Sequence, residues 1–181
     1  MGGANHSYLR MDYQDAIVKG LSKILVPTDL SESSLAGIGP ACMLAAAFRA
    51  EIILVHVVDA PSRFRFHRTE QGGDGARMDE PERSEKTLKE LAAERIQPAC
   101  PVRTMVRHGD AAREIIALAN EEKVDLIILA THGRSALSHV LLGSVAESVV
   151  RASGIPVMTV KPDYVRERML ESGDVEEQLH I

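Results

Sequence analysis

The stretch VDLIILATHGRSALSHVLLGS, from Val124 to Ser144, decides the fold. It opens with a mostly apolar run of the kind that forms a buried strand. A loop containing Gly133 follows, and Gly143 and Ser144 then open a stretch with helical character. These are the parts of an anion site, because glycine lets the backbone approach a phosphate and N–H groups at a helix start point at it. The loop has no Lys, so it is not a Walker A loop.

Patterns of the same kind alternate along the rest of the chain. Strands are predicted at 23–29, 51–59, 102–107, 124–130 and 156–160, and helices at 31–50, 81–95, 111–122 and 144–152. Strands that alternate with helices predict a parallel, doubly wound α/β sheet, and right-handed crossovers place helices on both of its faces. Alternation alone leaves the strand order open.

Local signals mark where these helices start and bend. Ser31 or Ser33 is the predicted N-cap of the first helix. Pro40 lies inside that helix, where it should remove one helical hydrogen bond and kink the axis. Gly109 is predicted to turn the chain before Asp110, which should cap the third helix.

Length and composition limit the possibilities. The 181 residues indicate one domain, predicted at 21–162, with an N-terminal extension at 1–20 and a charged tail at 163–181. Aromatic residues make up 3% of the chain and Trp is missing, so the core must consist of Ala, Val, Ile and Leu. The net charge of −5 and the lack of a basic patch or aromatic stacking platform argue against a nucleic-acid partner.

Cysteine usage and hydropathy suggest a compartment. Cys42 and Cys100 show neither CxxC nor metal-ligand spacing, and we interpret them as free thiols in a reducing compartment. Residues 1–20 lack the apolar core of a secretory signal, and no apolar run approaches the roughly 18 residues that span a bilayer. A cytoplasmic protein without a membrane partner is expected. Segment 60–80 is the one long irregular stretch, of a kind that is usually mobile or functional.

Several segments, taken in order, resemble the universal stress protein family. Nucleotide-binding members of that family carry Gly-x2-Gly-x9-Gly-[Ser/Thr] after the fourth strand, and this chain has Ala130-x2-Gly133-x9-Gly143-Ser144. The segments ILVPTDLS at 24–31, ILVHVV at 53–58 and GIPVMTV at 154–160 resemble the family's first, second and fifth strands. The resemblance covers about residues 23–161. It implies a Rossmann-like, adenine nucleotide alpha hydrolase-like fold of strand order 3-2-1-4-5, with ligands between the C-terminal ends of strands one and four.

The resemblance also implies a set of ligand contacts. They are Pro27, Thr28, Asp29 and Val57 for the adenosine end of an adenine nucleotide, and Gly133, Gly143, Ser144 and Val145 for its phosphates. Ala130, His132 and Arg134 complete the candidate site, with Arg134 as a phosphate clamp. ATP is the expected cofactor, with Mg²⁺ arriving on its phosphates.

Some of these residues have structural explanations that stay open. Asp29 stands just before Ser31 and could simply stabilise the start of the first helix. Gly133 could only provide a left-handed turn, and Ser144 could only be an N-cap. Ala130 replaces the first glycine of the motif, which costs little if it ends the strand with ordinary dihedral angles.

The remaining candidates do not point to catalysis. His56, inside the second strand, is interpreted as a satisfied core histidine, and Asp125 as a carboxylate that bonds to nearby loop backbone. His132 has no carboxylate marked to orient it as a base, and paired carboxylates and a Walker Lys are missing from the sequence.

The prediction is therefore an ATP-binding stress-response regulator that forms a homodimer through the fifth strand, at 156–160. Two alternatives stay open. One is a family member without nucleotide binding that acts as a dimeric interaction protein, and the other is a slow ATP hydrolase.

Overall fold

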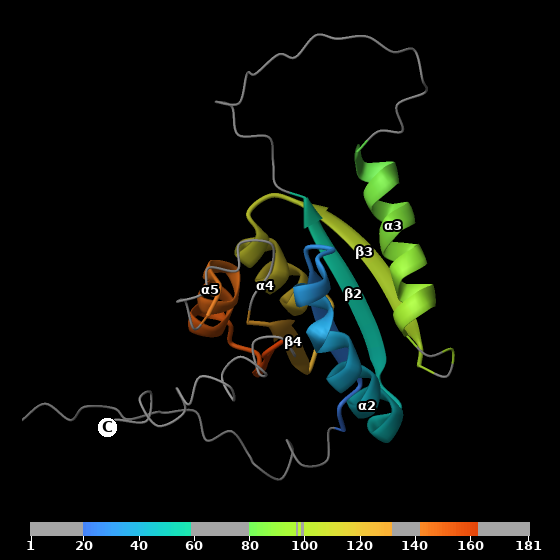
Figure 1. The fold of residues 1–181 in the computed structure, drawn as a ribbon. Helices are drawn as coiled ribbons and strands as arrows, with labels where there is room; N and C mark the ends of the chain where they lie inside the picture. Colours follow the sequence, from blue (N-terminus) through green and yellow to red (C-terminus); the bar gives the residue numbers. More distant parts are fainter. Residues whose placement is uncertain (1–19, 59–79, 97, 99, 132–141, 163–181) are drawn as a thin grey trace, which may run out of the picture.

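The described part of the chain folds around one parallel sheet. A computed structural model describes residues 20–58, 80–96, 98, 100–131 and 142–162. The strands are β1 (Lys23–Thr28), β2 (Glu51–Val58), β3 (Val102–His108), β4 (Leu126–Ala130) and β5 (Val157–Val160). Their order is β3-β2-β1-β4-β5, and every neighbouring pair is parallel (Figure 1). The predicted fold class and strand order are confirmed.

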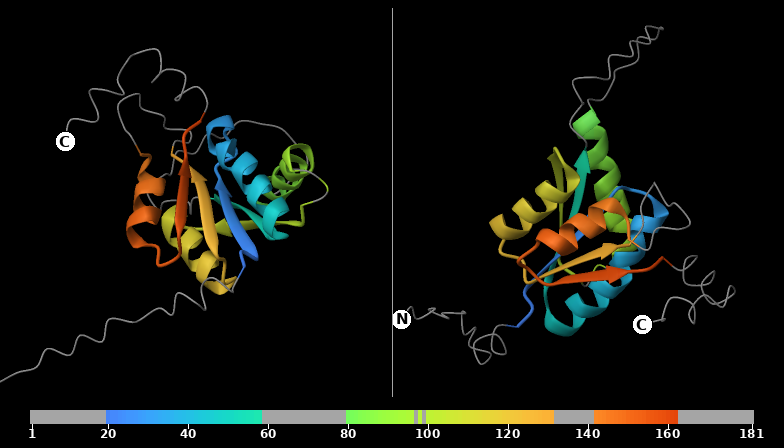
Figure 2. Two further views of the ribbon diagram at one scale, coloured as in Figure 1. Left: turned by 90° about the horizontal axis from the view of Figure 1, so that it is seen from below. Right: turned by 90° about the vertical axis from the view of Figure 1, so that its left-hand side faces the viewer.

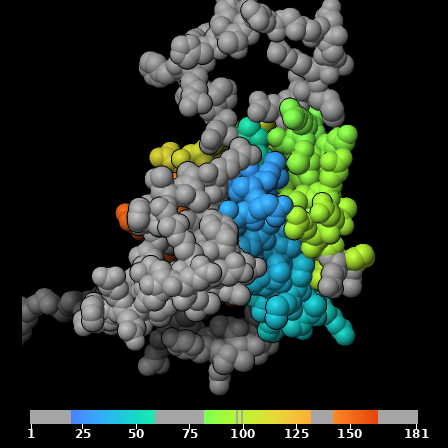
Figure 3. Space-filling view, in the orientation of Figure 1, coloured from blue at the N-terminus to red at the C-terminus, as the bar shows by residue number. Residues whose placement is uncertain are grey.

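Helices cover both faces of this sheet, as right-handed crossovers require. They are the 3-10 helix η1 (Glu32–Gly37), α2 (Ile38–Phe48), α3 (Glu80–Arg95), α4 (Ala111–Glu121) and α5 (Ser144–Ala152). The left panel of Figure 2 shows the sheet between α4 and α5 on one side and α2 and α3 on the other. In Figure 3, α2 and α3 lie side by side at the surface.

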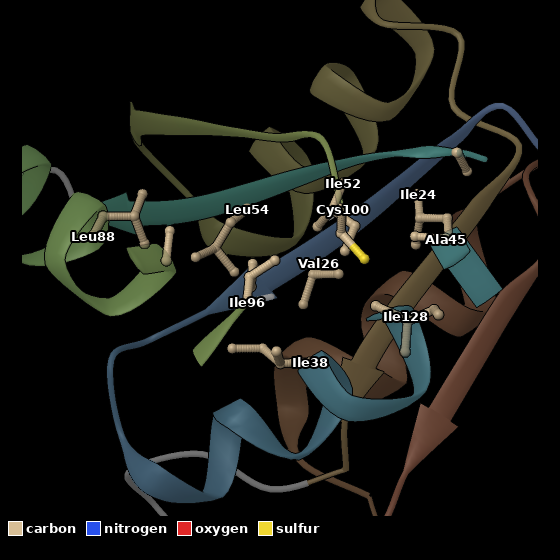
Figure 4. Close-up of a cluster of buried hydrophobic side chains, with 13 residues drawn as sticks. Ile24, Val26, Ile38, Ala45, Ile52, Leu54, Leu88, Ile96, Cys100 and Ile128 are labelled. Carbon is tan, nitrogen blue, oxygen red and sulfur yellow. The ribbon is translucent and has the colours of Figure 1, made fainter. Parts of the chain in front are cut away.

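Each face of the sheet has its own apolar core. Alternate β1 residues point to opposite faces. Accordingly, Ile24 and Val26 pack with α2 and α3, whereas Leu25 packs with α4 and α5. Figure 4 shows the first cluster, in which Leu88 and Ile96 meet the strand side chains. Burial on both faces explains why the strands are almost continuously apolar, since each position must contact a helix layer on one side or the other.

The region predicted as the first helix differs from the prediction. The segment forms η1 and then a separate α-helix that begins at Ile38, so Pro40 lies in the first turn of α2. Ile38 N donates to Leu35 O, so the first turn of α2 is bonded to η1, and Pro40, which has no N–H to donate, is the third residue of α2. Ser31 is the N-cap of η1, and its hydroxyl accepts from Ser34 N. The predicted single helix is therefore a 3-10 helix followed by an α-helix that contains Pro40.

Other predicted boundaries hold to within two residues. Gly109 has φ +144°, and the Asp110 side chain accepts from Arg113 N at 3.0 Å, so the turn and the cap of α4 are confirmed. Strand β4 begins at Leu126 instead of 124, because Val124 N still bonds to Ala119 O in the turn that follows α4. The irregular segment 60–80 and both predicted terminal segments fall almost entirely outside the described residues.

Two polar clusters tie the sheet together at its amino-terminal edge. One carboxylate oxygen of Asp125 accepts from Ser22 N at 2.8 Å, Ser22 Oγ at 2.7 Å and Lys23 N at 3.0 Å. Asp125 was predicted to bond to nearby loop backbone. The backbone it holds belongs to the segment that leads into β1, about a hundred positions earlier.

The second cluster centres on Glu122, the C-cap of α4. Both of its carboxylate oxygens accept from the Arg103 guanidinium, at 3.0 and 2.6 Å, and one also accepts from Lys23 Nζ at 3.2 Å. Arg103 Nε reaches Glu51 at 3.4 Å. The hydrogen bonds from Arg103, supported by Lys23, hold the pKa of Glu122 at about 2 instead of its ordinary 4.5. The carboxylate therefore links β1, β3 and α4.

Candidate functional site

The central strands β1 and β4 pair over only part of their length. Their register consists of Ile24 with Leu126 and Leu25 with Ile127, although β1 continues to Thr28 and β4 to Ala130. Pro27 lies beyond the last of these pairs, and a proline without an N–H is tolerated in a central strand where a ladder bond is not required. The pairing therefore ends at the point where the strand order reverses, which is where α/β sheets bind ligands.

A tight polar turn ends β1. Leu30 adopts φ +67°, and its N–H donates to Thr28 Oγ1 at 3.0 Å. The Ser34 hydroxyl donates to Ser31 O at 2.7 Å, so the hydroxyl contact between Ser34 and Thr28, at 2.8 Å, must be a donation by Thr28. Thr28 and Ser34 are both buried. Each of the two hydroxyls donates once and accepts once, which fixes the direction in which the chain leaves the sheet.

Asp29 lies inside this turn and is half-buried. Its Oδ1 accepts from Ser31 N at 3.0 Å and from Ser31 Oγ at 2.5 Å. Asp29 therefore supports the start of η1, which is the structural role that the sequence left open for it. A carboxylate offers about four acceptor positions, so this role and a contact to ligand hydroxyls or N–H groups are compatible.

At the end of β4, Ala130 stands where the family motif has glycine. It is the last residue of the strand, pairs with Val160 and has no positive φ. A methyl group therefore brings no backbone strain at this position. The next residue, Thr131, is buried, and its N–H donates to Val160 O at 2.9 Å.

A backbone hydrogen bond joins the start of α5 to the end of β4. Gly143 N donates to Thr131 O at 2.6 Å, which brings the second half of the motif next to β4. His132, Gly133 and Arg134 lie outside the described residues, so their predicted contacts stay predictions.

The N-terminus of α5 has the form that an anion site requires. Gly143 is the N-cap, with φ −63° and ψ 152°, and it makes no side-chain capping bond. Ser144 is the first helical residue, as predicted, so the alternative in which it is only an N-cap is wrong. Because glycine has no side chain, the N–H groups of the first turn receive no cap from it, and Ser144 and Val145 are exposed beside them.

Strand β2 contributes two neighbouring residues of opposite character. Val57 is half-buried and packs against the core on the α4 and α5 side. His56 points to the other face, is 8% exposed, and its Nδ1 lies 2.8 Å from Thr28 O. The interpretation of His56 as a satisfied, buried histidine agrees with this geometry.

Among the described residues, the His, Cys, Asp and Glu side chains form no group of three that could hold a metal ion. In the same part of the chain, no helix combines the length and the apolar character needed to cross a membrane.

Comparison with known proteins now gives the family. A sequence model of the universal stress protein family matches residues 20–161. The chain belongs to the universal stress protein family. It is 33% identical over 141 residues to universal stress protein MJ0531 of Methanocaldococcus jannaschii, covering 77% of this chain and 81% of that protein.

Solved structures of universal stress proteins have the same fold. The structure of MJ0577, from the same archaeon, superposes with a TM-score of 0.57 at 27% identity, covering 80% of this chain and 98% of that one. A universal stress protein in complex with cAMP superposes with a TM-score of 0.59 at 25% identity, covering 79% and 98%. This universal stress protein domain therefore has the family's sheet and helix layers.

Three contacts around the site of this family member were not recognised from the sequence. Ser34 closes the β1 turn, His56 reaches the Thr28 carbonyl, and Gly37 lets η1 approach β4. A Cβ on Gly37 would lie 3.3 Å from Ile128 O, a tight contact. The Ser-rich segment SESS at 31–34 was the available signal, since serines three apart suit a turn. The other two contacts join distant segments.

Proposed function

We propose that this universal stress protein binds an adenine nucleotide, with ATP as the ligand, between the carboxyl ends of β1 and β4. The observation that carries the proposal is the hydrogen bond from Gly143 N to Thr131 O. It holds the glycine-capped start of α5 at the end of β4, next to β1, which ends at Thr28 just before Asp29. The relative that is solved in complex with cAMP supports an adenine nucleotide as the ligand class.

The two ends of the ligand would meet different chemistry. The first-turn N–H groups of α5 and the Ser144 hydroxyl suit phosphate oxygens, because helix N-termini attract anions. Asp29 suits the hydroxyl or N–H donors of adenosine, and Pro27 and Val57 offer apolar surface to the base. Mg²⁺ would arrive on the phosphates. His132, Gly133 and Arg134 join the phosphate end in this proposal.

We propose further that the protein is a regulator and not an efficient enzyme. Phosphoryl transfer needs a positioned nucleophile and cationic clamps on the transferring group. The residues assigned to the phosphate end offer backbone N–H groups, one hydroxyl and Arg134, which suffice to hold a phosphate chain.

The regulatory unit would be a cytoplasmic homodimer formed through β5. This strand lies at the edge of the sheet. Met158 is 40% exposed and Thr159 is also exposed. An apolar edge strand is a liability that pairing with a second copy relieves.

Calorimetry of the purified chain with ATP and Mg²⁺ tests the binding proposal. We expect a dissociation constant in the micromolar range, which corresponds to roughly −7 to −8 kcal/mol. Mass spectrometry of protein purified without added nucleotide would show whether ATP, ADP or AMP is retained. No heat of binding and no thermal shift at millimolar ATP would refute the proposal in favour of the nucleotide-free interaction protein.

A further inference from the structure

The carbonyl oxygen of Thr28, at the end of β1, is held by a side chain from the neighbouring strand. Thr28 and His56 are register partners in β1 and β2, and His56 Nδ1 lies 2.8 Å from Thr28 O. A carbonyl can only accept, so the imidazole must carry a hydrogen on Nδ1. His56 is 8% exposed, and water therefore has little access to replace this donor.

The same residue, Thr28, is fixed a second time through its side chain. Its hydroxyl donates to Ser34 Oγ at 2.8 Å and accepts from Leu30 N at 3.0 Å. Hydroxyl bonds therefore hold the side chain, and the imidazole holds the carbonyl. The peptide unit from Thr28 to Asp29 cannot rotate without breaking a buried hydrogen bond, which is costly because a buried acceptor would lose its partner.

We infer that His56 is a positioning residue for the adenosine end of the ligand. By holding the Thr28 carbonyl, it fixes the peptide plane from which the Asp29 side chain projects, and it does so without contacting the ligand. This inference rests on the proposed nucleotide site. It assigns to His56 a role in affinity that the interpretation as a core histidine does not contain.

The role depends on a donor at one place in the side chain. The amide nitrogen of Asn, like Nδ1 of His, is attached to Cγ, so His56→Asn keeps a donor close to the same position. His56→Leu keeps an apolar side chain of similar width but leaves Thr28 O without its partner. Ile52→Val is the matched control, because Ile52 is fully buried on the same strand and the same face and makes no bond to Thr28.

The experiment measures calorimetric affinities of the full chain and the three variants for adenosine and for ATP with Mg²⁺. We expect His56→Leu to bind both ligands about tenfold more weakly, since loss of one buried hydrogen bond has roughly that effect. His56→Asn should stay within about threefold of the wild type, and Ile52→Val should bind like the wild type. In ¹⁵N NMR spectra of the wild type at neutral pH, Nδ1 of His56 should be the protonated ring nitrogen.

Other results would overturn the inference. They are wild-type affinity in His56→Leu, equal weakening in His56→Leu and Ile52→Val, failure of His56→Asn to restore binding, and an Nε2–H tautomer in the wild type. If His56→Leu does not fold, the affinity of His56→Asn and the wild-type tautomer still test the inference. A wild type that binds neither adenosine nor ATP would instead refute the proposed function, and this inference with it.

Discussion

Neutralising Glu122 should make the protein less stable at neutral pH and should change how its stability depends on pH. The carboxylate accepts two hydrogen bonds from Arg103 and one from Lys23, and these hold its pKa at about 2, against an ordinary value of 4.5. A group whose pKa is lower in the folded state stabilises the protein above its unfolded value and loses that effect as the pH falls through the folded value. For Glu122, the window runs from about 4.5 down to about 2.

The magnitude follows from these two values. A pKa difference of one corresponds to 1.36 kcal/mol, so the Glu122 pair has a ceiling of about 3.4 kcal/mol at neutral pH. Solvent screening reduces this figure, because the side chains of Arg103 and Glu122 are 40% and 20% exposed. We therefore expect Glu122→Gln to lower the free energy of unfolding by about 1–2 kcal/mol at pH 7.

Urea unfolding of the wild type and Glu122→Gln at several pH values between 7 and 2.5 tests this. The gap between the two proteins should be constant above about pH 5.5 and should shrink by more than half near pH 3, because the wild-type carboxylate is then losing its advantage. Glu90→Gln is the control, since the exposed pair of Glu90 with Lys86 should contribute less than about 0.5 kcal/mol. A gap that is absent at pH 7, or that stays the same down to pH 2.5, would refute the reasoning.

Four further predictions concern the site, the sheet, the assembly and catalysis. Gly143→Val should abolish ATP binding in calorimetry but leave the thermal midpoint within a few degrees, because φ −63° and ψ 152° suit valine; unchanged affinity would contradict the placement of the phosphates. Asp125→Ala should lower the free energy of unfolding, measured by chemical denaturation, by about 2–3 kcal/mol, because three donors lose one charged acceptor. A decrease below about 0.5 kcal/mol would show that the cluster does not stabilise the fold. Val157→Lys should convert a dimer to a monomer in light scattering, and a wild type that is monomeric at tens of micromolar would remove the proposed interface. In multiple-turnover assays, ATP hydrolysis should stay far below the ~1–100 s⁻¹ of dedicated phosphotransferases, and a rate near one per second that disappears in His132→Ala would favour catalysis.

Much of the fold could be predicted because its signals are local. A strand buried on both faces must be apolar along its length, and β1, β2 and β4 show this directly in their sequences. The strand order could not be derived in this way, since periodicity does not say which strands become neighbours. That order came from the resemblance to a family, and the structure confirms it.

The errors also have physical causes. The segment 31–50 was predicted as one helix because the apolar pattern continues through η1 and α2, and a pattern does not show where a 3-10 helix ends and an α-helix begins. Ser144 was considered as a possible N-cap because serine favours that position, but glycine is also accepted there, and Gly143 caps a helix that begins at Ser144. The bond from His56 to Thr28 joins residues 28 positions apart, so local sequence could indicate that the histidine is satisfied but not by which partner.

The incomplete pairing of β1 with β4 has a mechanical meaning. The strands β1, β2 and β3 form one leaf and β4 and β5 form another, and the register that joins the two leaves is confined to their amino-terminal halves. Toward the carboxyl ends, η1 spans both leaves, with Gly37 against the backbone of β4. A sheet whose two central strands pair over only half of their length bends most easily where those strands are not paired. A molecule held by Asp29 on one leaf and by the start of α5 on the other would cross-link the two leaves where they are not paired. It would thereby restrain their relative bending, and this restraint would extend through β4 to β5 at the edge of the sheet.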